Sequence, residues 1–165
     1  MSGSIDTQFL KLINENMGIA YKVCRIYFNG SEDQEDVLQE MMYQLWRSFD
    51  RFDRRSKFST WMYSVCLNTA LTYKRKTRNN PAISMDTEHE QIATHSENDK
   101  EEAIGELYKA IDTLTPVNKA IMMLYLEELS YEEIAEITGL TKSNVSVRLV
   151  RAKKELQQLM RNINN

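Results

Sequence analysis

The strongest structural signal in the chain is LSYEEIAEITGLTKSNVSVRLVRAKKELQQL, residues 129–159. Ser130 is suited to cap a short helix, and Glu133, three positions later, completes a capping box. Gly139 takes the position where a helix commonly ends in a left-handed residue, and Thr141 can cap the helix that follows. This stretch therefore predicts a helix-turn-helix.

The second helix of this motif has two different faces. Its apolar residues recur in steps of four and three, which predicts a buried stripe of Val145, Leu149, Ala152, Leu156 and Leu159. The opposite side carries Ser143, Val147, Val150 and Lys154, with Asn144, Arg148 and Arg151 on the flanks. A narrow outer face with a basic C-terminal half suits a helix in the DNA major groove. A plain helical hairpin with solvated basic residues is the alternative.

Composition limits the classes of protein to consider. A chain of 165 residues can hold one ordinary domain or two small ones. The first residues do not resemble a secretory signal, and no apolar run approaches the roughly 20 residues that cross a bilayer. We therefore expect a soluble, cytoplasmic protein. Cys24 and Cys66 lie in apolar helical patterns without a His or Cys cluster, so we expect buried thiols and neither a metal site nor a cofactor.

Charge is unevenly distributed although the net charge is only -3. Lys and Arg cluster at residues 74–78 and 142–154, whereas acids cluster at residues 32–40 and 86–102. Separate basic and acidic surfaces predict both nucleic-acid and protein partners.

Hydrophobic periodicity predicts helices along most of the chain and no strand. Helices are expected to begin near residues 9, 31 and 58, and periodicity resumes at residue 103 after an acidic stretch typical of a flexible linker. Thr115 and Pro116 predict one more helix start before the helix-turn-helix. The predicted fold class is all-α, with two small helical domains at residues 1–79 and 103–165 joined by a linker at residues 80–102.

The same periodicity predicts which residues face inward. In the first helix these are Leu10, Ile13, Met17, Ala20 or Tyr21, Cys24 and Phe28. In the second they are Val37, Leu38, Met41, Met42, Leu45 and Trp46, and in the third they are Met62, Val65, Cys66, Thr69 and Tyr73. We expect Ser31 to cap the second helix, and Ser59 or Thr60 to lie near the cap of the third.

Two surfaces of the N-terminal half are candidate sites. The second helix leaves an acidic face, which is either a docking surface for a basic helical partner or simply solvated. An arginine-rich loop at residues 50–57, Trp61 and the basic end of the third helix suit a binder of single-stranded nucleic acid. There cations would hold phosphates, and each stacked base would contribute about 1–3 kcal/mol. Trp61 could equally be a core residue.

Two segments together resemble a known family. Residues 32–76 resemble region two of bacterial sigma-70 family sigma factors of the extracytoplasmic-function group, and residues 111–156 resemble region four. The matching positions of region two are Asp36, Gln39, Glu40, Trp46, Phe52, Phe58, Thr60, Trp61, Asn68 and the basic tail. Those of region four are Leu114, Thr115, Pro116, Leu129, Ser130, Tyr131, Glu133, Ile134, Ala135, Gly139, Val145, Arg148, Leu149, Arg151 and Ala152.

The resemblance implies a non-enzymatic protein, monomeric when free, that binds core RNA polymerase and promoter DNA and is commonly restrained by an anti-sigma factor. It implies a polymerase-docking set of Asp33, Asp36, Gln39, Glu40 and Gln44. It implies a minus-ten set of Arg54, Arg55, Ser56, Lys57, Phe58, Trp61, Asn68, Lys74, Arg75, Lys76 and Arg78. It implies a minus-thirty-five set of Lys142, Ser143, Asn144, Ser146, Val147, Arg148, Val150 and Arg151.

The chain departs from the group at three positions of the minus-thirty-five set. The group usually has Lys, Ser and His where this chain has Ser146, Val147 and Val150. Outward valines favour thymine methyl groups over hydrogen bonds to guanine, so we expect an A/T-leaning preference at this element.

Two other protein classes remain as alternatives. A dimeric helix-turn-helix regulator would need a dimer interface or a ligand pocket in the N-terminal half. A carboxylate-bridged metal enzyme would need inward Glu-x-x-His pairs, to which neither His89 nor His95 belongs.

Overall fold

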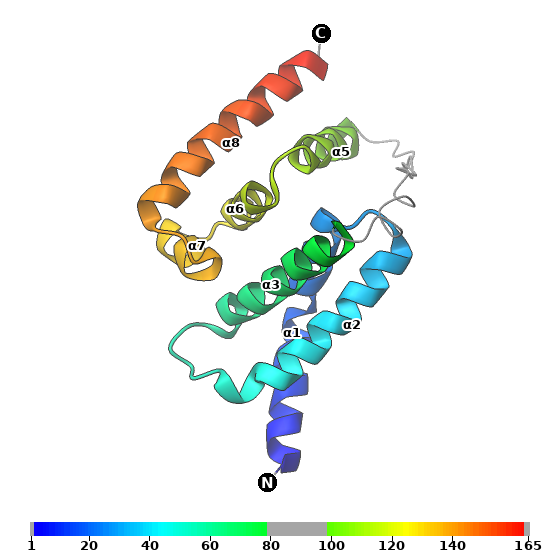
Figure 1. Cartoon of the computed structure of the whole chain (residues 1–165), viewed down its shortest axis with the longest axis vertical. Helices are drawn as coiled ribbons and strands as arrows, with labels where there is room; N and C mark the ends of the chain where they lie inside the picture. The colour runs from blue at the N-terminus through cyan, green and yellow to red at the C-terminus, as the bar shows by residue number, and fades with distance from the viewer. Residues whose placement is uncertain (1, 79–98, 164–165) are drawn as a thin grey trace. The chain divides into compact units, whose positions relative to one another are not determined.

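The computed structural model describes residues 2–78 and 99–163, and all regular structure in these ranges is helical (Figure 1). The chain forms two compact units, residues 1–90 and 91–165. The prediction of an all-α fold with two small helical domains is therefore confirmed. Most of the predicted linker, with His89 and His95, lies outside the described residues.

The first unit is a bundle of three helices that all contact one another: α1 (Ser2–Tyr27), α2 (Ser31–Ser48) and α3 (Phe58–Arg78). A short 3-10 helix, η1 (Phe49–Arg51), follows α2. The interior is built from inward residues of all three helices: Ala20, Val23, Cys24, Val37, Met41, Leu45, Met62, Cys66 and Ala70. Both cysteines are buried free thiols, as predicted, and burial raises the pKa of Cys24 to about 11.

Some predicted inward residues of this unit are wrong. Leu10 is 57% exposed because the buried stripe of α1 runs through Phe9, and adjacent residues of a helix point about 100° apart. For the same reason Leu45 is buried and Trp46 is 59% exposed. Of the two alternatives Ala20 and Tyr21, Ala20 is buried and Tyr21 faces outward.

The predicted starts of α2 and α3, near residues 31 and 58, are confirmed, but their predicted caps need correction. Ser31 is the first residue of α2 rather than its cap, and the preceding Gly30 makes no side-chain capping bond. Helix α3 begins at Phe58, so Ser59 and Thr60 already lie in its first turn.

The second unit contains α5 (Asp99–Asp112), α6 (Pro116–Leu126), α7 (Tyr131–Thr138) and α8 (Lys142–Ile163). Helix α8 contacts each of the other three. The core is formed by Ile111, Leu114, Ile121, Leu124, Ile134, Val145, Leu149 and Ala152. Helix α5 starts four residues before the predicted position, and Ala103 is exposed rather than buried.

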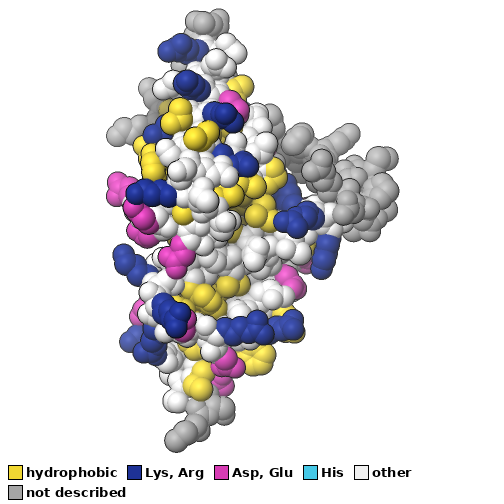
Figure 2. Space-filling view, turned by 60° about the vertical axis from the view of Figure 1, so that its left-hand side comes forward, with side chains coloured by type: hydrophobic (Ala, Val, Ile, Leu, Met, Phe, Trp, Pro, Cys, Tyr) yellow, Lys and Arg dark blue, Asp and Glu magenta, His cyan; other side chains and the backbone are white. Residues whose placement is uncertain are grey.

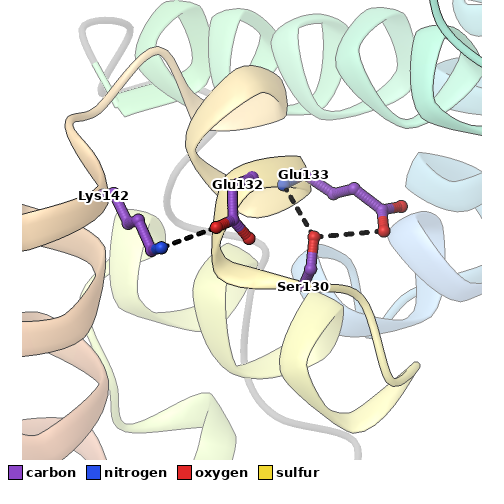
Figure 3. A network of polar contacts seen from close by, with 4 residues as sticks. All are labelled: Ser130, Glu132, Glu133 and Lys142. Carbon is purple, nitrogen blue, oxygen red and sulfur yellow. Dashed lines mark hydrogen bonds and ion pairs between the residues drawn. The ribbon is translucent and has the colours of Figure 1, made fainter.

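Helix caps of this unit are as the sequence predicts. The hydroxyl oxygens of Thr115, Ser130 and Thr141 each accept a hydrogen bond from the backbone N–H three residues later. Gly139 adopts a left-handed φ of 76° between α7 and α8. The capping box differs in one detail, because the Glu133 carboxylate accepts from the Ser130 hydroxyl at 3.1 Å (Figure 3).

No described helix combines the length and the apolarity that crossing a membrane requires.

We predict that Gly139→Ala destabilises the second unit by about 1–2 kcal/mol, because a Cβ is unfavourable in the left-handed region. Chemical denaturation followed by circular dichroism would measure this. Gly105→Ala is the matched control, since Gly105 lies inside α5 with open space for a Cβ and should gain about 0.5–1 kcal/mol. Equal stability of the two variants would contradict the role assigned to the turn.

Candidate functional site

Burial of one side of α8 determines which of its residues face solvent. Val145, Leu149 and Ala152 are completely buried, which turns the opposite side of the helix away from the rest of its unit. Of the predicted minus-thirty-five set, Ser146 and Arg148 are half-buried and the others are exposed. Figure 2 shows Lys and Arg side chains beside hydrophobic ones along this side of the second unit. The surface therefore combines cations with apolar groups.

Two valines give this surface its apolar part. Val147 is 48% exposed and Val150 is 49% exposed, in agreement with the predicted outward direction. Their methyl groups can contact an apolar group on a ligand without moving any core residue. The thymine C5-methyl is the apolar group that the major groove offers.

Lys142 stands at the start of α8 and pairs with Glu132 of α7 at 2.5 Å (Figure 3). The hydrogen bond from Lys142 is the main cause that lowers the pKa of the Glu132 carboxyl, and a hydrogen bond from its own backbone N–H also contributes. Both side chains are exposed, and exposed ion pairs are weak. A DNA phosphate can therefore replace Glu132 as the partner of Lys142.

Arg148 is the most restrained member of this set. Its Nε donates to Oδ1 of Asn144 at 3.1 Å, and its Nη1 donates to Oδ1 of Asn118 at 3.3 Å. Sequence reasoning missed Asn118, which lies on α6, because the contact joins residues 30 positions apart. A pattern within a short segment of sequence cannot predict a hydrogen bond between residues so far apart.

In the first unit, an aromatic cluster holds the predicted arginine loop at its base. The rings of Phe49, Phe52, Phe58 and Trp61 lie with centroids 5.3 to 6.5 Å apart. Phe9 of α1 adds an edge contact of 5.1 Å to Phe49. Phe58 and Trp61 are only half-buried, so their exposed edges can still contact a ligand. The cluster was not predicted, although its four nearby aromatics were visible in the sequence.

The loop between η1 and α3 presents its cations to solvent. Arg54 has a positive φ of 64°, which is uncommon for a residue with a side chain. Arg55 donates through its backbone to Oδ1 of Asp53 at 3.0 Å and pairs with the same carboxylate through Nε. Lys57 is exposed and Ser56 is half-buried.

One face of α3 continues from this loop toward its basic end. Trp61, Asn68 and Arg75 are spaced seven residues apart, so they lie within about 40° of one another around the helix. Lys76 is exposed beside them, whereas Lys74 lies over the Phe28 ring at 5.4 Å. The backbone of Arg78 ends α3, but its side chain lies outside the described part.

The acidic face of α2 is exposed along most of its length. Asp36, Gln39 and Glu40 are exposed, and Asp33 and Gln44 are half-buried. Burial is the main cause that raises the pKa of the Tyr73 hydroxyl, and the charges of Asp33 and Asp36 also contribute.

Two exposed aromatic side chains, Tyr43 and Trp46, extend the surface of α2 beyond these polar residues. Trp46 also lines a shallow groove with Ile5, Phe9 and Phe49. Sequence reasoning missed both as surface residues: Trp46 was predicted to face inward, and Tyr43 was assigned to neither face although it lies about 200° from Met41 around the helix.

Two family models match the chain, each within one compact unit. The model described as sigma-70 region 2 matches residues 12–80, and the model described as sigma-70, region 4 matches residues 104–156.

Relatives of the same kind are similar over most of the chain. The ECF RNA polymerase sigma-E factor of Haemophilus influenzae is 32% identical over 138 residues, which cover 76% of this chain and 73% of that protein. The RNA polymerase sigma factor SigV of Bacillus subtilis is 30% identical over 135 residues, which cover 81% and 80%.

Solved structures share the fold. The sigma factor RpoE of Bartonella quintana, in complex with the anti-sigma factor NepR, matches with a TM-score of 0.75 and 19% identity, over 93% of this chain and 97% of that one. CnrH, in complex with the cytosolic domain of CnrY, matches with a TM-score of 0.69 and 18% identity, over 95% and 90%. Neither a dimeric regulator nor a metal-bundle enzyme is expected to pair region 2 with region 4. The chain therefore belongs to the extracytoplasmic-function group of the sigma-70 family and is an RNA polymerase sigma factor, a non-enzymatic protein of transcription initiation.

Proposed function

We propose that this sigma factor divides promoter recognition between its two units. The outer face of α8 reads the minus-thirty-five duplex, and the arginine loop with the Trp61 face of α3 holds unpaired minus-ten bases. The acidic face of α2 docks on core RNA polymerase. The observation that carries this proposal is the division of α8: Val145, Leu149 and Ala152 are fully buried, whereas every member of the minus-thirty-five set remains solvent-accessible. In this proposal the region 2 domain covers residues 1–79, the linker covers residues 80–102 and the region 4 domain covers residues 103–165.

The energetics of strand opening require the polymerase. Separating base pairs costs about 1.4 kcal/mol of stacking for each step. One or two stacked bases return only about 1–3 kcal/mol each. The net charge of -3 also disfavours nonspecific DNA binding by the free chain. Stable promoter binding and opening should therefore need core polymerase.

Both solved neighbours are complexes with a second protein, which in one of them is described as an anti-sigma factor. We propose that this sigma factor is likewise restrained by an anti-sigma protein. We also propose that it is monomeric when free and works in the cytoplasm, where core polymerase transcribes DNA.

Run-off transcription on genomic fragments tests the proposal directly. We predict that core polymerase with this chain produces transcripts from new start sites, and that the chain alone neither binds nor opens those fragments tightly. Permanganate footprinting would detect the open strands. Start sites that do not change when the chain is added would reject the proposal, as would strand opening by the chain alone.

Charge reversal tests the docking surface. We predict that the Asp36→Lys, Glu40→Lys double variant loses at least about tenfold in affinity for core polymerase, because like charges facing each other cost several kcal/mol. Both positions are exposed, so the melting temperature should hardly change. Glu15→Lys on the exposed side of α1 is the matched control. Binding measured by fluorescence anisotropy that is equal in all variants would remove this assignment.

A promoter selection tests the two valines. We predict that a library randomised at the minus-thirty-five element returns an A/T-leaning consensus with the native protein. The Val147→Ala, Val150→Ala double variant should show a weaker thymine preference, since exposed valines can be shortened without disturbing the core. A G-rich consensus with the native protein would contradict this prediction.

A further inference from the structure

A chain of polar contacts links α6 to the outer face of α8. It runs from Asn118 through Arg148 to Asn144, with the hydrogen-bond distances of 3.3 and 3.1 Å given above. Asn144 and Arg148 lie four residues apart on α8, so they are neighbours on its surface. All three residues belong to the second unit.

A helix cap restrains the asparagine at each end of this series of polar contacts. The backbone N–H of Asn118 donates to the Thr115 hydroxyl at 3.4 Å, in the first turn of α6. The backbone N–H of Asn144 donates to the Thr141 hydroxyl at 3.1 Å, in the first turn of α8. Each asparagine therefore sits three residues after a capping threonine, and Arg148 joins two restrained helix ends.

The donors of the Arg148 guanidinium determine how the side-chain amides of Asn118 and Asn144 are oriented. A guanidinium has donors and no acceptor, so the atom of each asparagine that faces Arg148 must be its carbonyl oxygen. The Nδ2 group of Asn144 is then directed away from Arg148. Asn144 is exposed at the beginning of α8, so its two N–H donors are available to a ligand.

We propose that Asn118 is a positioning residue for promoter recognition. It holds Arg148, which in turn orients the Asn144 amide so that Asn144 donates to acceptors on the base edges of the minus-thirty-five duplex. The acceptors of this kind in the major groove are purine N7, guanine O6 and thymine O4. This inference rests on the proposed role of α8 in reading duplex DNA. Asn118 itself does not need to touch DNA.

Two substitutions at residue 118 separate positioning from simple folding. Asn118→Leu has a similar size but no acceptor, whereas Asn118→Asp keeps an oxygen that accepts from Arg148. With the holoenzyme, we expect Asn118→Leu to lower transcription from the selected promoter about tenfold, the loss expected for one hydrogen bond to a charged group. It should also broaden the base preference opposite Asn144. We expect Asn118→Asp to retain both properties.

A double-mutant cycle tests the link through Asn144. In an Asn144→Ala background, Asn118→Leu should cause no further change in base preference. An equal change in both backgrounds would overturn the inference, as would equal defects in Asn118→Leu and Asn118→Asp. A native base preference in a folded Asn118→Leu protein, judged by thermal melting, would also overturn it.

The same experiment distinguishes this inference from the proposed function. If Asn144→Ala changes base preference while Asn118→Leu does not, α8 reads the duplex and only the positioning role is wrong. If neither Asn144→Ala nor the double valine variant changes base preference, the proposed role of α8 itself is wrong.

Discussion

The buried stripe of α8 is the constraint on which the second unit depends. Val145, Leu149 and Ala152 lose all contact with solvent, and they pack where α5, α6 and α7 meet the helix. Burying a valine or leucine side chain stabilises a protein by about 1.5–3 kcal/mol, so a rotation of α8 about its axis would be strongly unfavourable. The direction of the outer face follows from this packing. Residues such as Val147 therefore stay exposed and do not support the core.

In the first unit the predicted DNA contacts begin in a loop, so packing of a single helix cannot fix their direction. A loop has no helical hydrogen bonds to hold it, and here a cluster of aromatic rings fulfils that role. Aromatic pairs contribute about 0.5–1.5 kcal/mol each beyond their buried area. Phe58 and Trp61 belong to the cluster and remain half-exposed. The two interpretations of Trp61, as core residue and as binding residue, are therefore compatible.

The sequence predicts the caps of the second unit correctly because their physical cause is local, although the caps predicted for α2 and α3 were wrong. A threonine or serine hydroxyl reaches a backbone N–H three residues away, and Gly139 adopts a left-handed conformation within a single residue. Errors occurred where two adjacent apolar residues competed for one inward position, as at Leu45 and Trp46. Both fit the 3.6-residue period, and only the position of the neighbouring helices selects between them.

By itself the sequence determined the all-α class, the two-unit organisation, the helix-turn-helix and the family, because these depend on periodicity, on caps and on motifs within short segments. Tertiary structure alone decided that four aromatic rings and Phe9 hold the arginine loop. It also decided that Asn118 lies within hydrogen-bonding distance of Arg148. The Phe9–Phe49 and Asn118–Arg148 contacts join residues that are far apart along the chain. They exist only after packing has placed the helices, so no local pattern encodes them.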